Sequence, residues 1–334
     1  MNRIAHAIAL LCFAASSSLA QAQNAPADKI TMMSAGPAIS FSPIYLLELL
    51  GYAKEEGLDY SVKTVFANTL NLVVAGDGDL AVIGLSSALV PAREGKETSI
   101  VYSLATGLAT GFLAGTEKVK SLKDCTRVST SMAGSAVYSA TIAYKTMTNS
   151  SYTVLQLGDP AQVVPSVLSG GSDCAVSALG ILQPGLDNGM HLIVDPRVPS
   201  TIPTGTIQDT IGTGFWGMKD NLQKKRTAVE KLMRAMKRVH QYIRTTPTSD
   251  VAALLVKHNE YKAFKPDVAL RQLEQEKLFW FPNDGYFPAS FWTPTLKYYQ
   301  YGMQFIEPGN KIYSWDSRVD MSYWIVANGQ PARK

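Results

Sequence analysis

The segments VAGDGDLAV at residues 74–82 and LSGGSDCAV at residues 168–176 share Gly, Asp, Ala and Val at four aligned positions. In each segment an apolar helical stretch meets a glycine, the residue that most often follows the last turn of a helix. A polar turn comes next, and then a short apolar run typical of a buried strand. The repetition indicates two similar α/β units rather than one long sheet.

Strand and helix patterns alternate around both segments. Strands are predicted at 29–34, 60–66, 79–83, 98–104, 127–131, 153–157 and 173–177. Helices are predicted at 42–56, 69–75, 86–94, 135–147, 161–168 and 222–244. Alternation with short connections predicts mainly parallel sheets covered by helices. An aromatic-rich segment at 279–301 is expected to pack a helical core, and the sequence leaves open whether residues 300–334 join that core or contact a partner.

The first 22 residues have the pattern of a secretory signal peptide. Arg3 precedes an apolar stretch of about a dozen residues, and Ala20-Gln21-Ala22 provides the small residues that signal peptidase requires. An apolar stretch of this length is too short for a permanent transmembrane helix, which needs about 20 residues. We therefore expect cleavage near Ala20–Ala22 and a periplasmic product.

Composition excludes several classes of protein. Of the 334 residues 46% are hydrophobic and only 17% charged, which is incompatible with intrinsic disorder. The net charge of +4 is too small for a dedicated nucleic-acid binder. We expect no stable membrane insertion, no metal, because neither Cys-x-x-Cys nor His-x-His occurs, and no cofactor.

Two motifs suggest chemistry that their context does not support. Gly212, Gly214 and Gly217 have the spacing of a dinucleotide fingerprint, but no buried strand precedes them, so a glycine-rich hinge is the better interpretation. The run GLSSA at 84–88 resembles the nucleophile elbow of a serine hydrolase, with Ala88 in place of the final Gly. A secreted hydrolase using Ser86 stays open as an alternative, whereas helix capping is the simpler role.

Cys125 and Cys174 are the two cysteines left after removal of the leader. Cys125 precedes one predicted strand and Cys174 opens another, so both lie at the same end of a sheet if the strands are parallel neighbours. An oxidising compartment allows such a pair to form a disulfide. The alternative is two buried thiols.

Several phrases resemble the NMT1/THI5-like substrate-binding proteins of ABC transporters, which include binders of sulfonates, taurine, nitrate and pyrimidine precursors. The phrases are KIT at 29–31, FSPIY at 41–45, GYAKEEGL at 51–58, AGDGDLAV at 75–82, SLKD at 121–124, GDP at 158–160 and SGGSDCA at 169–175. The resemblance implies a type II periplasmic binding protein: an α/β fold of two lobes joined by hinge strands, with the ligand cleft between them. The cysteine-rich run of the family's eukaryotic pyrimidine synthases is missing, which favours binding over catalysis.

The resemblance also implies a division of the chain. Residues 1–22 form the signal peptide, 23–108 the first part of lobe 1, 109–214 lobe 2, and 215–334 the return to lobe 1 with the C-terminal helices. Closure is expected about hinges near Gly107–Gly111 and Gly212–Gly217. The implied partner is an ABC permease, and the protein is expected to act as a monomer; a sensor that reports to a receptor is the alternative.

Ligands of open α/β sheets bind outside the carboxyl ends of the strands. The residues expected there are Ile39, Ser40, Phe41, Ser42, Ser86, Ser87, Thr106, Gly134, Ser135, Ala136, Asp159, Ser177 and Ala178. Small side chains at helix N-termini suit anions, so the predicted ligand is a small organic anion such as a sulfonate or carboxylate. Asp159 would instead favour an amine or a pyrimidine, and we expect it to cap the helix that follows Pro160.

Overall fold

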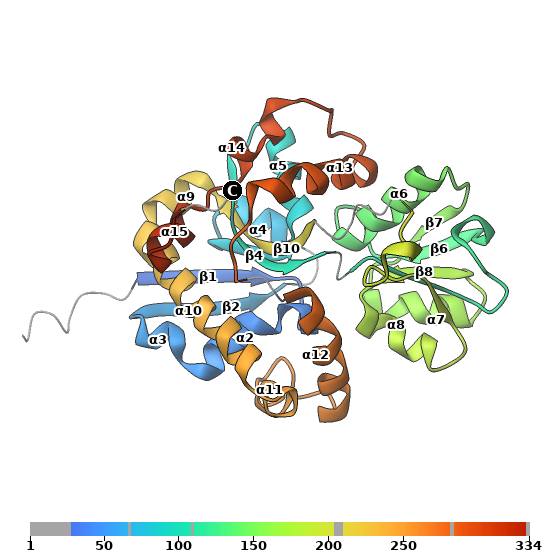
Figure 1. Ribbon diagram of the computed structural model, residues 1–334, viewed down its shortest axis with the longest axis horizontal. Helices are drawn as coiled ribbons and strands as arrows, with labels where there is room; N and C mark the ends of the chain where they lie inside the picture. Colours follow the sequence, from blue (N-terminus) through green and yellow to red (C-terminus); the bar gives the residue numbers. More distant parts are fainter. Residues whose placement is uncertain (1–27, 66–67, 108–109, 204–209, 281–283, 332–334) are drawn as a thin grey trace, which may run out of the picture.

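Two five-stranded sheets organise the computed structural model, which describes residues 28–65, 68–107, 110–203, 210–280 and 284–331 (Figure 1). The predicted signal peptide lies outside these ranges. The first sheet has the order β2-β1-β3-β10-β4, built from β1 (Asp28–Ser34), β2 (Leu58–Thr64), β3 (Leu80–Gly84), β4 (Thr98–Thr106) and β10 (Ile211–Met218). The second has the order β7-β6-β8-β5-β9, built from β5 (Phe112–Gly115), β6 (Arg127–Thr130), β7 (Thr153–Gln156), β8 (Cys174–Ser177) and β9 (His191–Val194). Each sheet belongs to one lobe, so the prediction of two α/β units is confirmed.

Helices cover both sheets. Those before the second lobe are η1 (Ile39–Phe41), α2 (Ser42–Leu50), α3 (Tyr52–Glu55), α4 (Thr69–Ala75), η2 (Leu85–Ala88) and α5 (Leu89–Arg93). Lobe 2 contributes η3 (Leu122–Asp124), α6 (Ala136–Thr148), η4 (Pro160–Gln162), α7 (Val163–Leu168) and α8 (Leu179–Leu186). After β10 come α9 (Lys219–Lys224), α10 (Arg226–Thr245), α11 (Thr248–Leu255), α12 (Pro266–Trp280), η6 (Ala289–Phe291), α13 (Trp292–Gly302), η7 (Lys311–Tyr313), α14 (Trp315–Arg318) and α15 (Ser322–Asn328).

The predicted helix at 42–56 is two helices, because Gly51 adopts a left-handed conformation with φ of 71° between α2 and α3. The long amphipathic helix is confirmed as α10, which begins after a break at Lys225. Within the described ranges, no helix combines the length and the apolar character needed to cross a membrane.

The repeated segment performs the same structural task in each lobe. The carboxylate of Asp79 accepts a hydrogen bond of 2.8 Å from the backbone N–H of Thr31 on the neighbouring strand β1. In the second lobe, the carboxylate of Asp173 accepts from the backbone N–H groups of Thr126 and Arg127, at 2.8 and 2.9 Å, where β6 begins. Each aspartate therefore precedes one strand, β3 or β8, and binds the backbone of the parallel neighbour, β1 or β6, which accounts for its presence in both copies.

The glycine-rich segment at 212–217 is part of a sheet rather than an irregular connection. Residues 212–217 lie in β10, which runs antiparallel between β3 and β4, and the expected lobe boundary at residue 214 falls inside this strand. A Cβ atom on Gly214 would collide with the carbonyl oxygen of Tyr102, and one on Gly217 would collide with that of Asp79. These glycines allow close backbone approach rather than bending. The chain crosses between lobes after β4 and again between β9 and β10.

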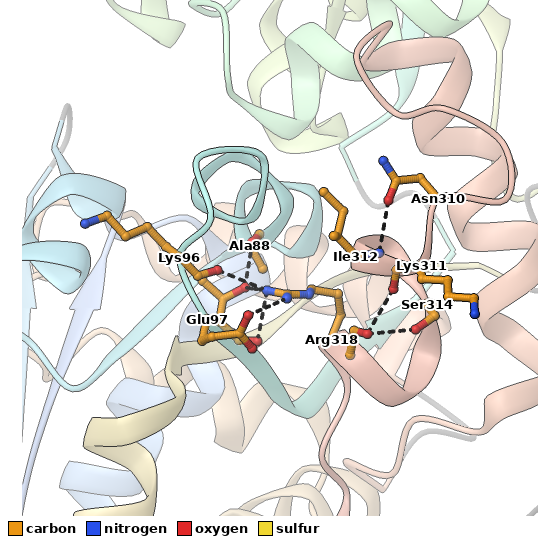
Figure 2. Close-up of polar contacts among 10 residues, drawn as sticks. Ala88, Lys96, Glu97, Asn310, Lys311, Ile312, Ser314 and Arg318 are labelled. Carbon is orange, nitrogen blue, oxygen red and sulfur yellow. Dashed lines mark hydrogen bonds and ion pairs between the residues drawn. The ribbon is translucent and has the colours of Figure 1, made fainter.

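The end of the chain belongs to the core of lobe 1. Tyr323 and Trp324 are 1% and 0% exposed. Arg318, only 3% exposed, donates from Nη1 to the carbonyl oxygen of Lys96 at 3.2 Å and to Oγ1 of Thr98 at 3.0 Å (Figure 2). The guanidinium thus attaches the C-terminal segment to the turn before β4.

Replacement of Arg318 by Ala should lower the free energy of unfolding by about 3 kcal/mol, because it leaves buried carbonyl groups without a donor. Arg318→Lys should lose nearly as much, since one ammonium cannot reproduce the forked geometry. Urea unfolding measures both changes. The exposed Lys311 on the same segment serves as control, and equal effects of Lys311→Ala and Arg318→Ala would contradict the assignment.

Candidate functional site

Two pairs of helices connect the lobes: α13 of lobe 1 packs against α6 of lobe 2, and α12 of lobe 1 packs against α8 of lobe 2. In Figure 1, α13 of lobe 1 extends towards α6, and α12 lies on the opposite side, nearer α8. Gly302 at the end of α13 approaches the backbone of Ser139 on α6 so closely that a Cβ atom would collide with the carbonyl oxygen. On the other side, Nε2 of Gln272 on α12 donates to the carbonyl oxygen of Gly180 on α8 at 3.3 Å.

The carboxyl ends of the strands face each other between these contacts. Gly84 ends β3, and a Cβ atom placed on it would lie 2.5 Å from Cβ of Ala136, the first residue of α6 in lobe 2. Because β1 runs parallel beside β3, its carboxyl end lies at the same sheet edge. Gly180, just after β8, contacts lobe 1 through Gln272. The predicted site residues after β1, β3, β6 and β8 therefore border the space between the lobes.

Burial differs among the predicted residues. Those that are buried are Ile39, Ser40, Ser42, Ser86, Ser87 and Ser177. Those that are partly buried are Phe41, Thr106, Ser135, Ala136 and Ala178, and those that are exposed are Gly134 and Asp159.

Two of the buried serines have hydroxyl groups without a hydrogen-bond partner. Ser42 begins α2 and is 0% exposed, and Ser86 lies in η2 and is 1% exposed; neither Oγ has a partner among the described residues. An unsatisfied buried hydroxyl costs about 1–3 kcal/mol. Ser86 directly follows β3, and Ser42 follows β1 after η1, so both come after strands whose carboxyl ends share one edge of the sheet.

Other predicted residues have structural roles. Oγ of Ser87 donates to the carbonyl oxygen of Gly84 at 2.7 Å and accepts from Nε1 of Trp216 at 2.8 Å. Ser135 caps α6 by accepting from the backbone N–H of Tyr138. Asp159 caps η4 by accepting from the backbone N–H of Ala161 at 2.9 Å, as the sequence led us to expect.

Residues from the C-terminal third, which the sequence did not single out, support the lobe 1 side. The hydroxyl of Tyr261 donates to the carbonyl oxygen of Ala38 at 2.8 Å and so holds the loop that leads into η1. Burial raises the pKa of Tyr299, and a hydrogen bond with the backbone of Ser86 opposes that effect. Tyr299 lies in the aromatic-rich segment at 279–301 and Tyr261 precedes it, so the contribution of both to the site depends on tertiary contacts.

Glu276 on α12 is a buried acidic residue that lies near Tyr261. It is 7% exposed, burial raises the pKa of its carboxyl group to about 8, and its Oε2 has no partner among the described residues. Glu276 follows Gln272 by four positions and therefore lies on the same helix face. The sequence could not indicate this burial, because acidic residues on a helix usually face solvent.

Among the described residues, no histidine forms a hydrogen bond with the hydroxyl of Ser86. His258 lies 2.9 Å from the carboxylate of Glu48, and His240 packs edge-on against Tyr102 inside lobe 1. No cluster of three potential metal ligands occurs in the part of the chain that the structure describes.

Two surface hollows lie away from the meeting of the lobes. One, of about 530 Å³, lies beside α3 and β2 and includes Leu47 and Tyr60; the other, of about 460 Å³, includes Thr116 and Asp173 in lobe 2. Their linings contain none of the predicted binding residues, so neither hollow coincides with the candidate site.

The predicted disulfide between Cys125 and Cys174 is present, with a Cα–Cα distance of 6.0 Å. It ties the segment before β6 to the first residue of β8, which are parallel neighbours. The bridge therefore lies within lobe 2, at the end of the sheet opposite the candidate site.

Two similar α/β lobes, crossed twice by the chain and facing each other with the carboxyl ends of their strands, define the periplasmic binding protein fold. The expected type II architecture is thereby confirmed. The family model described as "NMT1/THI5 like" matches residues 38–249, and the chain belongs to this family. No curated protein sequence matches the chain significantly.

Solved structures agree with this fold. The alkanesulfonate-binding protein SsuA from Xanthomonas axonopodis pv. citri, bound to MOPS, superposes with a TM-score of 0.67 at 14% identity, covering 85% of this chain and 96% of its own. The nitrate-binding protein NrtA from Synechocystis PCC 6803 has a TM-score of 0.70 at 13% identity, with 92% and 90% covered. A Candida albicans protein described as having the generic periplasmic binding protein fold has a TM-score of 0.66 at 14% identity, with 88% and 96% covered.

Proposed function

We propose that this protein is a periplasmic solute-binding protein that captures a small organic anion between its lobes and delivers it to an ABC importer. The observation that carries the proposal is the pair of buried, unpartnered hydroxyls of Ser42 and Ser86 at the edge of lobe 1 that faces lobe 2. The relatives' names, which mention alkanesulfonate and nitrate, are consistent with an anion.

The chemistry of the site supports an anion in two ways. Ala178 caps α8, so this helix starts just after the carboxyl end of β8 and offers backbone N–H groups there. Small residues, such as Ala136 and Ser177, allow a ligand to approach the backbone closely. Closure would be favoured only by contacts that the ligand makes with both lobes.

Export and delivery complete the proposal. A cleavable leader at residues 1–22 would bring the protein to the periplasm, where the Cys125–Cys174 disulfide persists. The closed pair of lobes would then be the form that a permease recognises, with the binding protein acting as a monomer.

A thermal-shift screen against methanesulfonate, acetate, benzoate, nitrate and 4-aminopyrimidine tests the ligand class. At least one of the sulfonate or carboxylate probes should raise the unfolding midpoint. If 4-aminopyrimidine does so and no anion does, the anion proposal is wrong.

Removal of either unpartnered hydroxyl should weaken binding of the ligand found in that screen. Ser42→Ala and Ser86→Ala should each lower affinity roughly tenfold or more, since a hydrogen bond to a charged group contributes about 1.5–3 kcal/mol. Isothermal titration measures the change, with the exposed Ser249→Ala as control. Ester hydrolysis by the wild type that Ser86→Ala abolishes would favour the hydrolase alternative instead.

A further inference from the structure

His258 lies in the turn after α11 and joins this turn to α2. Its Nε2 is 2.9 Å from a carboxylate oxygen of Glu48 on α2, and the two side chains are 14% and 30% exposed. The helices α11 and α2 also pack against each other (Figure 1). The other carboxylate oxygen of Glu48 accepts from the backbone N–H of Val62 on β2 at 3.1 Å. Glu48 therefore fastens His258 to two elements of lobe 1.

The hydrogen bonds of the imidazole assign its proton. Nδ1 of His258 accepts from the backbone N–H of Glu260 at 3.2 Å and so carries no proton, which leaves Nε2 as the donor to Glu48. Both ring nitrogens thus have a partner, and the ring cannot turn without the loss of a hydrogen bond. A side chain with one nitrogen donor of the same reach, such as glutamine, can reproduce the bond to Glu48.

The imidazole ring of His258 packs against two buried tyrosines. Its centroid lies 5.0 Å from that of Tyr45 on α2 and 6.4 Å from that of Tyr261, in both cases edge-on. The two phenol rings also contact each other, with centroids 5.2 Å apart. Tyr45 and Tyr261 are 1% and 0% exposed, so neither ring can move without disturbing a close-packed interior. The imidazole therefore forms one wall of the space in which both tyrosines are held.

Both tyrosines contact the loop between β1 and η1. The hydroxyl of Tyr261 donates to the carbonyl oxygen of Ala38 at 2.8 Å. The hydroxyl of Tyr45 lies 3.5 Å from the carbonyl oxygen of Gly36. This loop leads into η1 and then directly to Ser42, one of the two buried serines whose hydroxyls have no partner among the described residues. The imidazole can therefore act on the candidate binding segment through the two phenol hydroxyls.

We propose that His258 is a positioning residue, which fixes Tyr45 and Tyr261 so that they hold the loop between β1 and η1 in the arrangement that binds the ligand. This role rests on the proposed function, which places Ser42 at the ligand. His258 needs no contact with the ligand, because the tyrosine hydroxyls carry its effect. When only a fraction of the molecules has the loop in the binding arrangement, the apparent affinity falls by that fraction. Loss of the imidazole should therefore weaken binding although every group proposed to touch the ligand is still present.

Hydrogen exchange of the ligand-free protein, followed by mass spectrometry, tests the hold on the loop. In His258→Ala the amides of residues 35–42 should exchange roughly two- to tenfold faster, because loss of one hydrogen bond shifts a local opening equilibrium by about that factor. The amides of β3 and of lobe 2 should keep their rates. His258→Gln should restore most of the protection, because its amide nitrogen can donate to Glu48. Lys257→Ala, an exposed change at the preceding position, is the control.

Tyr261→Phe tests the same role without any change at His258. It removes only the hydroxyl that bonds to Ala38 and keeps the buried ring, so this variant is expected to fold even if His258→Ala does not. Exchange at residues 35–42 should be faster here too. In the double variant the acceleration should be smaller than the product of the two single effects, since residues that act through one another are not additive.

Isothermal titration with methanesulfonate, benzoate and nitrate relates the loop to binding. His258→Ala and Tyr261→Phe should each bind the anions that the wild type binds roughly two- to tenfold more weakly, in proportion to the lost fraction of the binding arrangement. His258→Gln and Lys257→Ala should bind them as the wild type does.

Four results would contradict the role of His258: an unchanged loop in His258→Ala, an unchanged loop in Tyr261→Phe, faster exchange spread evenly over lobe 1, or no recovery in His258→Gln. Faster exchange confined to the loop, with unchanged affinity for the anions, would overturn the link to binding and leave the proposed function standing. If no anion binds the wild type while the exchange pattern is as expected, the anion proposal is wrong and the hold of His258 on the loop stands.

Discussion

Gly302→Ala is expected to weaken ligand binding roughly 5- to 150-fold. The added Cβ atom collides with the backbone carbonyl of Ser139 on α6, and backbone cannot move aside as a flexible side chain can. Overpacking of this kind costs about 1–3 kcal/mol, and the cost falls on the arrangement in which α13 contacts α6, which we expect to be the ligand-bound one. Isothermal titration measures the loss of affinity, and small-angle scattering should show a larger radius of gyration.

A loss of affinity would be explained by the contact between α13 and α6 and not by a change in the stability of α13 itself. Alanine in place of glycine normally favours a helix by up to about 1 kcal/mol, so α13 alone would not be weakened. Lys297→Ala, an exposed change on the same helix, is the control. An affinity and a radius of gyration equal to those of the wild type would show that the α13–α6 contact does not govern closure.

Loss of the Cys125–Cys174 disulfide should lower the free energy of unfolding by about 4 kcal/mol. The cysteines are 49 positions apart, and the chain-entropy account assigns a loop of this length a stabilisation of that order. The Cys125→Ala, Cys174→Ala double variant is compared with the wild type by urea unfolding. Because domains are stable by only about 5–15 kcal/mol, the unfolding midpoint should fall by a large margin.

A reducing agent gives an independent measurement. Dithiothreitol should lower the unfolding midpoint of the wild type and leave that of the double variant unchanged. Because Asp173 separately ties the start of β6 to β8 through Thr126 and Arg127, lobe 2 should keep its fold when the disulfide is absent. A wild-type midpoint that does not respond to reduction would contradict the expected stabilisation.

The sequence predicted those features that depend on local pattern. The repeated segment at 74–82 and 168–176 indicated two lobes because the helix end, turn and strand that it encodes are formed by neighbouring residues. Asp79 and Asp173 explain why the repeat includes an acidic residue: each binds the backbone of the adjacent strand. The disulfide could be predicted because its cysteines flank two strands of one sheet.

The glycine-rich segment shows where local pattern is insufficient. Glycines are favoured both where a chain bends and where two backbones pack closely, so residues 212–217 were consistent with a hinge. The neighbouring strands explain the glycines, because the carbonyl oxygens of Tyr102 and Asp79 leave no space for a Cβ atom on Gly214 and Gly217.

The sequence by itself determined the two-lobed α/β fold, the sheet edges at which we propose the site and the cysteine pair, because these follow from residues close in the chain or from the rules of parallel sheets. Only the tertiary structure decided which side chains are candidates for that site. Ser42 and Ser86 are distinguished by buried atoms without partners, and Gly302 by its approach to α6. Burial and the loss of hydrogen-bond partners depend on elements far apart in the chain, so they arise only when the C-terminal helices pack against the two lobes.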